Sequence, residues 1–220
     1  MIEIKITDVI KEACPKMRLG CIQAKVNIGE SSENLLNELN NYSDKIMDEM
    51  AIEDIASLEK IHDCREVYKK LGKAPSIYRV SSEALLRRIL HKKGLYKINN
   101  IVEINNFISI KSHFSVGSYD VDKIKSSVCL TVAKKGDTYK GIGKDFLNME
   151  NLPVLCDEIS IFGSPTSDSQ RAMITDETKE IIMCIYSFSG EEELQNYLDE
   201  AKSLLIKYAD ARDISTKIID

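Results

Sequence analysis

The positively charged side chains between Lys60 and Lys97 are the residues of this sequence best suited to bind a ligand. The segment holds eleven Lys and Arg residues against three Asp and Glu residues, a local charge of +8. Cations gathered on one surface neutralise phosphates, and interleaved tyrosines stack on unpaired bases. The segment therefore predicts contact with RNA or another phosphate ligand, the alternative being that it forms the solvated faces of two helices. The candidate contacts are Arg65, Lys69, Arg79, Arg87, Arg88 and Lys92.

Two groups of uncharged polar residues offer a second kind of site, a pocket. Four asparagines lie in the apolar segment 98–113, where buried amides must be hydrogen-bonded. They either brace neighbouring loops or line a polar pocket. The loop GSPTSDSQRAMIT, which runs from Gly163, holds Ser164, Asp168 and Arg171 between two predicted strands. Such a loop can bind a carboxylate or a phosphate, although loops of this composition are more often plain polar hairpins.

The signals for metal or nucleophilic chemistry are weak. The six cysteines form no CxxC pair, and no histidine lies at metal-ligand spacing from two of them. We expect reduced structural thiols, no metal site and no cofactor. The sequence contains no P-loop, no GxGxxG, no HExxH and no GxSxG motif. A hydrolase that uses Cys184 as nucleophile is a third possibility, but a Cys within IIMCIY is typical of a buried, inert thiol.

The elements that must position these residues are predicted as a helical part followed by a β-rich part. Residues 18–28 read as a strand that ends at Gly29, and Ser32 as the N-cap of a helical region that continues to Gly72. Helices follow from Ser81 and across 98–113. Short apolar runs at 127–133, 138–142, 152–156, 158–162, 171–174 and 180–188 are typical of a sheet, and 191–211 of an amphipathic helix. This order predicts an α+β fold.

The 220 residues, with 43% apolar and 30% charged side chains, are typical of a folded domain and exclude disorder. No apolar run approaches the roughly 18 residues of a membrane helix, and the first residues do not resemble a signal peptide. We expect a cytoplasmic protein that does not contact membranes. The net charge is −5, so outside the basic segment the charge is −13. Any contact with nucleic acid is therefore expected to be local.

The order of the motifs from Arg65 to Phe188 adds a resemblance. Asn99, Val102, Glu103 and Asn106 match the pattern N-x-x-V-D/E-x-x-N, and Tyr119-Asp120 follow as an aromatic-Asp pair. Downstream, Gly136, Asp137 and Gly143 match the motif A-x-x-G-E-x-x-x-x-x-G, which spans a pair of strands. The last matching residues are Asp157, Gly163, Thr178 and Phe188. Together these motifs resemble the B3/4 domain, the tRNA-editing domain of the phenylalanyl-tRNA synthetase beta subunit, which also occurs as free-standing bacterial proteins.

The resemblance implies a fold of sandwiched β-sheets with flanking helices over residues 1–220, helix-rich to residue 112, β-rich over 113–188 and ending in a helix at 190–211. In the synthetase this domain hydrolyses tRNA charged with tyrosine by mistake. Two positions depart from that pattern, because the family's pocket His falls on Gly117 and the carboxylate that recognises the wrong amino acid falls on or beside Cys184. A thiol is a poor hydrogen-bond partner for a phenol, so tyrosine editing is not expected.

Two functions follow as expectations. The first is a tRNA- or aminoacyl-tRNA-binding protein. If it is an enzyme, it is a trans-editing deacylase that hydrolyses the ester of a mischarged aminoacyl-tRNA. Its pocket would lie between Asn106 and the loop from Ser164 to Arg171. The alternative is a non-catalytic protein that binds an amino-acid-like molecule on a repurposed editing fold. The candidate pocket residues are Asn99, Asn106, Gly117, Asp157, Ser164, Arg171, Thr178 and Cys184.

Overall fold

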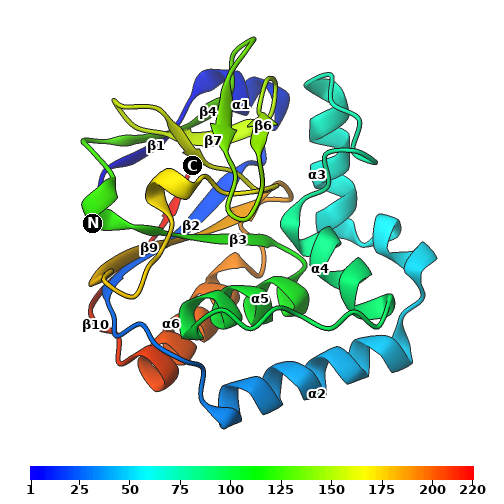
Figure 1. Ribbon diagram of the computed structural model, residues 1–220. Coiled ribbons are helices and arrows are strands. Elements are labelled where there is room, and N and C mark those ends of the chain that lie inside the picture. Colours follow the sequence, from blue (N-terminus) through cyan, green and yellow to red (C-terminus); the bar gives the residue numbers. More distant parts are fainter.

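A computed structural model describes all residues from Met1 to Asp220 and shows two stacked β-sheets with helices against the outer face of one of them (Figure 1). The chain is α+β, as the sequence predicts. One apolar cluster fills the space between the two sheets, and a second fills the space between one sheet and the helices.

The central sheet has the strand order β10-β2-β9-β3, all antiparallel. Its strands are β2 (Arg18–Lys25), β3 (Ser115–Asp120), β9 (Glu180–Ser187) and β10 (Arg212–Ile219). Because side chains alternate along a strand, Ile182, Cys184 and Tyr186 of β9 face the other sheet, whereas Met183 and Ile185 face the helices. This strand is therefore buried on both faces.

The second sheet has the order β1-β4-β7-β8, with β1 parallel to β4 and the other pairs antiparallel. Its strands are β1 (Ile4–Ile6), β4 (Val128–Val132), β7 (Pro153–Cys156) and β8 (Ile161–Gly163). A small hairpin of β5 (Thr138–Lys140) and β6 (Phe146–Asn148) projects beside it. The loop that follows β8 returns toward this hairpin through a bridge between Gly141 and Ser169.

The helices form two groups (Figure 1). Helix α5 (Asn100–Ser112) and α6 (Leu194–Ala209) lie against the central sheet, and α2 (Glu33–Glu49) runs beneath them. Helix α3 (Glu59–Lys70) contributes Cys64, Val67 and Tyr68 to the core between the sheets. Helix α4 (Ser81–Leu90) packs beside it, and the short α1 (Asp8–Ala13) follows β1. Helices α3 and α4 carry the basic segment.

The predicted elements differ from the structure in five places. The helical region from Ser32 is interrupted, because α2 ends at Glu49 and a 3-10 helix at Ile52–Ser57 precedes α3. The run at 171–174 is not a strand, since Gln170–Ala172 form a 3-10 turn. Strands β3, β6 and β10 were not predicted. Strands β3 and β10 lie at the two edges of the central sheet, and their sequences SVGSYD and RDISTKII lack the regular apolar alternation that identifies a strand.

Two further observations concern the whole chain. None of the helices combines the length and the apolar character needed to cross a membrane. All six cysteines are free, with Cys129 and Cys156 half-buried and the other four buried.

Candidate nucleic-acid interface and the buried tyrosine cluster

A basic hollow lies along the exposed face of α4. Its volume is about 380 Å³, and its lining contains no acidic residue. Positions 84, 87, 88 and 91 recur at the three- and four-residue spacing that places side chains on one helix face. The six residues that line it are Arg79, Ala84, Arg87, Arg88, His91 and Lys93. Three of the six predicted RNA contacts are therefore brought together here.

Beneath this hollow, the fully buried carboxylate of Glu83 holds three guanidinium groups. It accepts hydrogen bonds from Arg65 Nη1 at 3.0 Å and from Arg87 Nε at 2.9 Å. Arg79 Nε lies 3.7 Å from the same carboxylate. Arg65 comes from α3, so this cluster also joins α3 to α4. Arg79 and Arg87 of this group also line the hollow, so the single buried carboxylate leaves an excess of positive charge there.

Arg88 is held by a different contact. Its guanidinium lies 3.8 Å from the centre of the Tyr96 ring, donates to Tyr96 Oη at 3.0 Å and donates to the Lys93 carbonyl at 3.2 Å. Tyr96 itself remains 65% exposed. The hollow therefore has an aromatic surface at its rim.

The two predicted lysine contacts lie outside the hollow. Lys69 on α3 pairs with Glu66 at 2.6 Å. Lys92 lines a separate hollow with Asp44 and Asp48 of α2. A phosphate that enters the basic hollow would not touch either lysine.

The positions of Gly117 and Cys184 lie directly opposite each other on β3 and β9, facing the core between the sheets. The space next to them is filled by two phenol side chains, Tyr119 and Tyr186, whose hydroxyl oxygens are 2.8 Å apart. A Cβ atom at Gly117 would lie 2.5 Å from Tyr119 Oη, and one at Gly163 would lie 2.4 Å from it. The absence of a side chain at these two glycines is what admits the Tyr119 ring.

Asp168 completes this tyrosine cluster. Its Oδ1 accepts hydrogen bonds from Tyr119 Oη at 2.8 Å and from the Ser164 backbone N–H at 3.2 Å. Burial raises the pKa of the Asp168 carboxyl to about 6, although the Tyr119 hydroxyl, the Ser164 N–H and the charge of Lys144 oppose the shift. The pKa of both phenols is raised far above the ordinary value, chiefly by burial, so they remain protonated donors.

Ser164 organises the loop rather than facing a cavity. Its hydroxyl donates to the Ser167 carbonyl at 2.8 Å and accepts from the backbone N–H groups of Thr166 and Ser167. Tyr139 and Tyr68 reach the same loop, through hydrogen bonds from Tyr139 to Ser164 and between Tyr68 and Thr166. Three tyrosines, Tyr68, Tyr119 and Tyr139, therefore hold the loop by side-chain hydrogen bonds.

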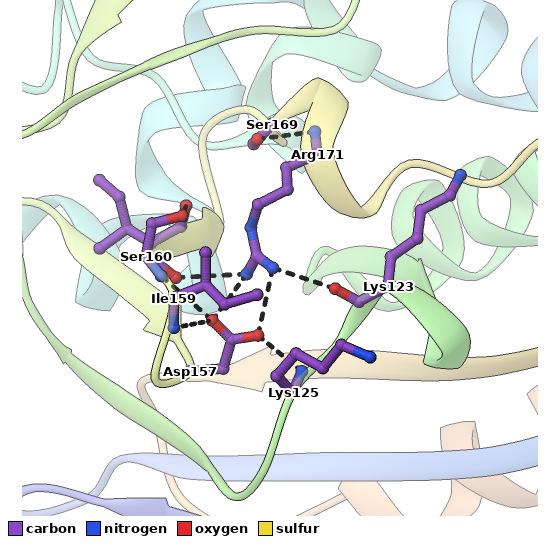
Figure 2. Close-up of polar contacts among 8 residues, drawn as sticks. Lys123, Lys125, Asp157, Ile159, Ser160, Ser169 and Arg171 are labelled. Atoms are coloured by element: carbon purple, nitrogen blue, oxygen red, sulfur yellow. Dashed lines mark hydrogen bonds and ion pairs between the residues drawn. The ribbon is translucent and has the colours of Figure 1, made fainter.

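Figure 2 shows that Asp157 and Arg171 bind each other. The Arg171 guanidinium donates to both carboxylate oxygens, at 2.9 and 3.1 Å, and to the carbonyl of Lys123 at 3.0 Å. Asp157 also accepts the backbone N–H groups of Lys125, Ile159 and Ser160. Burial raises the pKa of Asp157, but these donors outweigh it and hold the pKa below its usual range. Both groups are thus occupied within the protein.

The remaining pocket candidates also have structural partners or lie elsewhere. Asn99 caps α5 by accepting the Val102 N–H at 2.9 Å. Thr178 donates to Asp120 at 2.7 Å. Asn106 lies half-buried on α5, which packs on the face of β3 opposite to Gly117. Asn106 and the loop from Ser164 to Arg171 are therefore not joined in one pocket, because the central sheet lies between α5 and the tyrosine cluster.

The sequence reasoning missed the role of Glu83. A signal was present, since Glu83 lies four residues from both Arg79 and Arg87, the spacing of ion pairs on a helix. Its burial, and the approach of Arg65 from another helix, could be seen only in the folded chain.

These features define an α+β domain that carries a local basic surface on α3 and α4. A family model described as the B3/4 domain matches residues 63–209, which is more than half of the chain. The chain belongs to the B3/4 domain family, as its motifs predict.

Comparison with curated proteins finds no match. Among solved structures, the chain is similar to an N-terminal fragment of the phenylalanyl-tRNA synthetase beta subunit from Pyrococcus horikoshii, at 13% sequence identity and a TM-score of 0.47. The match covers 99% of this chain and 50% of that chain, so this chain spans about half the length of the fragment.

Proposed function

We propose that this protein binds RNA, and tRNA in particular, through the basic hollow on α4. The observation that carries the proposal is the lining of that hollow, which combines Arg79, Arg87, Arg88, His91 and Lys93 without an acidic residue. Phosphate oxygens are the ligands that such a group of donors attracts. Membership of the B3/4 domain family supports RNA as the source of the phosphates.

The charge distribution limits the size of this contact. The segment from Lys60 to Lys97 carries +8, whereas the other residues carry −13. An RNA chain would be attracted to α4 and repelled by most of the remaining surface. Binding is therefore expected to be confined to a few phosphates, and to weaken steeply as salt is added.

A more specific version of this proposal is that the protein also hydrolyses the ester of an aminoacyl-tRNA. The group that favours it is Asp168, a carboxyl with a pKa of about 6 beside Gly117. Against it stand the rings of Tyr119 and Tyr186, which occupy the space where an aminoacyl group would enter. The basic hollow also lies on α4, away from the core between the sheets. We therefore favour RNA binding without hydrolysis.

Fluorescence anisotropy with a labelled tRNA tests the binding. The informative variant combines Arg88→Glu with Lys93→Glu, because neither side chain pairs with Glu83 and the core of the cluster stays intact. We expect the affinity at 50 mM salt to fall by about tenfold or more, since two phosphate contacts become repulsive. Lys202→Glu, an exposed change on α6, is the control and should lower the affinity by much less.

Absence of tRNA binding by the unmodified protein at 50 mM salt would overturn the proposal. A deacylation screen over mischarged aminoacyl-tRNAs tests the hydrolytic form separately. Release of an amino acid that is lost in Asp168→Asn would show that the tyrosine cluster opens during catalysis. No release with any substrate, together with retained binding, is the result we expect.

A further inference from the structure

We infer that the basic hollow on α4 binds a terminal phosphate monoester of RNA in preference to an internal phosphodiester. The inference rests on the proposed RNA binding and specifies which part of the RNA the hollow recognises.

The charge of the hollow favours a ligand with more than one negative charge. Arg79 and Arg87 line the hollow together with Arg88 and Lys93, and the only carboxylate beneath them is that of Glu83, so positive charge there exceeds negative charge. A phosphate monoester carries a charge of about −1.5 to −2 at pH 7, because its second pKa is about 6. An internal phosphodiester carries a single negative charge. The monoester therefore matches the unpaired charge more closely, and it offers three terminal oxygens to several guanidinium groups.

The donor groups of the hollow are held in place before a ligand arrives. Glu83 is fully buried and holds Arg87 at 2.9 Å, while Arg88 is held by Tyr96 and by the Lys93 carbonyl. Side chains that are already ordered lose little conformational entropy on binding. Their planar donor groups also favour a compact anion with several acceptors over a point contact along a passing chain.

The surroundings of the hollow favour a chain end over a continuous RNA backbone. On the other side of the end of α4, Asp44 and Asp48 of α2 line the neighbouring hollow. An RNA backbone that continued past α4 in that direction would bring its phosphates toward these carboxylates. A chain end can occupy the basic hollow without this cost.

The ring of Tyr96 lies beside the hollow and is 65% exposed. A nucleobase attached to the bound phosphate can stack on this ring, as unpaired bases do on aromatic side chains. The volume of about 380 Å³ is also larger than a lone water site and falls within the range of small-ligand sites. The hollow thus fits a terminal nucleotide with its phosphate.

The test compares labelled RNA oligonucleotides of one sequence that differ only at their ends: a 5′-phosphate, a 3′-phosphate, or hydroxyl groups at both ends. Affinity for the full chain is measured by anisotropy at 50 mM salt and pH 7.5. We expect one of the two phosphorylated RNAs to bind about tenfold more tightly than the RNA without a terminal phosphate, as expected for one additional charge near partly screened guanidinium groups. The end that gives this preference identifies the source of the monoester.

Two variants locate the effect. Arg79→Gln combined with Lys93→Gln removes two cations from the hollow and should abolish the preference for the phosphorylated end. Lys69→Gln removes a cation outside the hollow and should leave the preference unchanged. Thermal unfolding of each variant checks that it remains folded. Arg79 is 46% exposed at its side chain, so its removal is tolerated better than that of Arg87.

The possible failures are distinct. Equal affinity for all three RNAs would overturn the terminal-phosphate inference and leave RNA binding intact. A preference that persists in the Arg79→Gln, Lys93→Gln protein would also overturn it, because the phosphate would then bind elsewhere. Absence of binding to every RNA, including tRNA, would overturn the proposed function as well.

Discussion

The ion pair between Asp157 and Arg171 decides whether Arg171 serves the fold or a ligand. We predict that Asp157→Ala lowers the free energy of unfolding by about 3 kcal/mol and Arg171→Ala by about 2 kcal/mol. The Asp157 side chain is inaccessible to solvent, whereas that of Arg171 is 22% exposed, so the values lie near the lower limit for buried ion pairs. Asp157→Ala costs more because it also leaves three backbone N–H groups without their acceptor.

Urea denaturation of the two single variants and the double variant measures the coupling between them. We expect a coupling of about 1–2 kcal/mol, since each single change removes the same bidentate contact. Lys25 and Asp213 form a matched control, with a 2.8 Å contact between largely exposed side chains, and no measurable coupling is expected there. If Arg171→Ala leaves the stability unchanged, the reasoning fails and Arg171 is free to bind a ligand.

Two further predictions concern the tyrosine cluster. Gly117→Ala should destabilise the protein by about 2 kcal/mol, because the new Cβ atom would lie 2.5 Å from Tyr119 Oη. Gly29→Ala is the control, because a Cβ atom at Gly29 would have no atom within 4 Å. Thermal melting compares the two variants. An equal melting temperature for both variants would contradict the packing described here. The pKa of Asp168 is about 6 in the folded protein and about 3.9 in an unfolded chain. Between about pH 3.9 and pH 6 the folded protein therefore binds a proton that the unfolded chain does not, so the contribution of Asp168 to stability grows as the pH falls through 6. Unfolding measured at pH 7.5 and pH 5 should therefore show a stability gain that is about 1 kcal/mol larger in the unmodified protein than in Asp168→Asn; equal gains would place the carboxyl in a more polar environment.

Local sequence signals predicted the elements with strong periodicity. Strand β2, helices α4 and α6, and the N-cap of α2 at Ser32 occur where the pattern indicates them. Strand β10 was missed because five of its eight residues are polar and exposed at the edge of the sheet, so no apolar alternation identifies it. The break between α2 and α3 was missed because apolar residues keep helical spacing across the 3-10 turn.

The candidate site was predictable in composition and not in arrangement. The excess of cations between Lys60 and Lys97 can be counted directly, and Arg87 and Arg88 must lie on adjacent positions of one helix. The sequence cannot tell which cations are held by an anion, since Arg65 reaches Glu83 from another helix. It also cannot show that Asp157 and Arg171, which are fourteen residues apart, satisfy each other.

The sequence by itself determined the α+β class, the B3/4 motifs and the location of the basic segment, because these depend on residue order and on periodicity within one element. Only the tertiary structure decided which polar groups remain available. Tyr119 and Tyr186 meet across two strands and fill the space beside Gly117, while Arg65 of α3 reaches the buried carboxylate of Glu83 on α4. Those contacts join residues that are distant along the chain, and their distances are set by packing between elements.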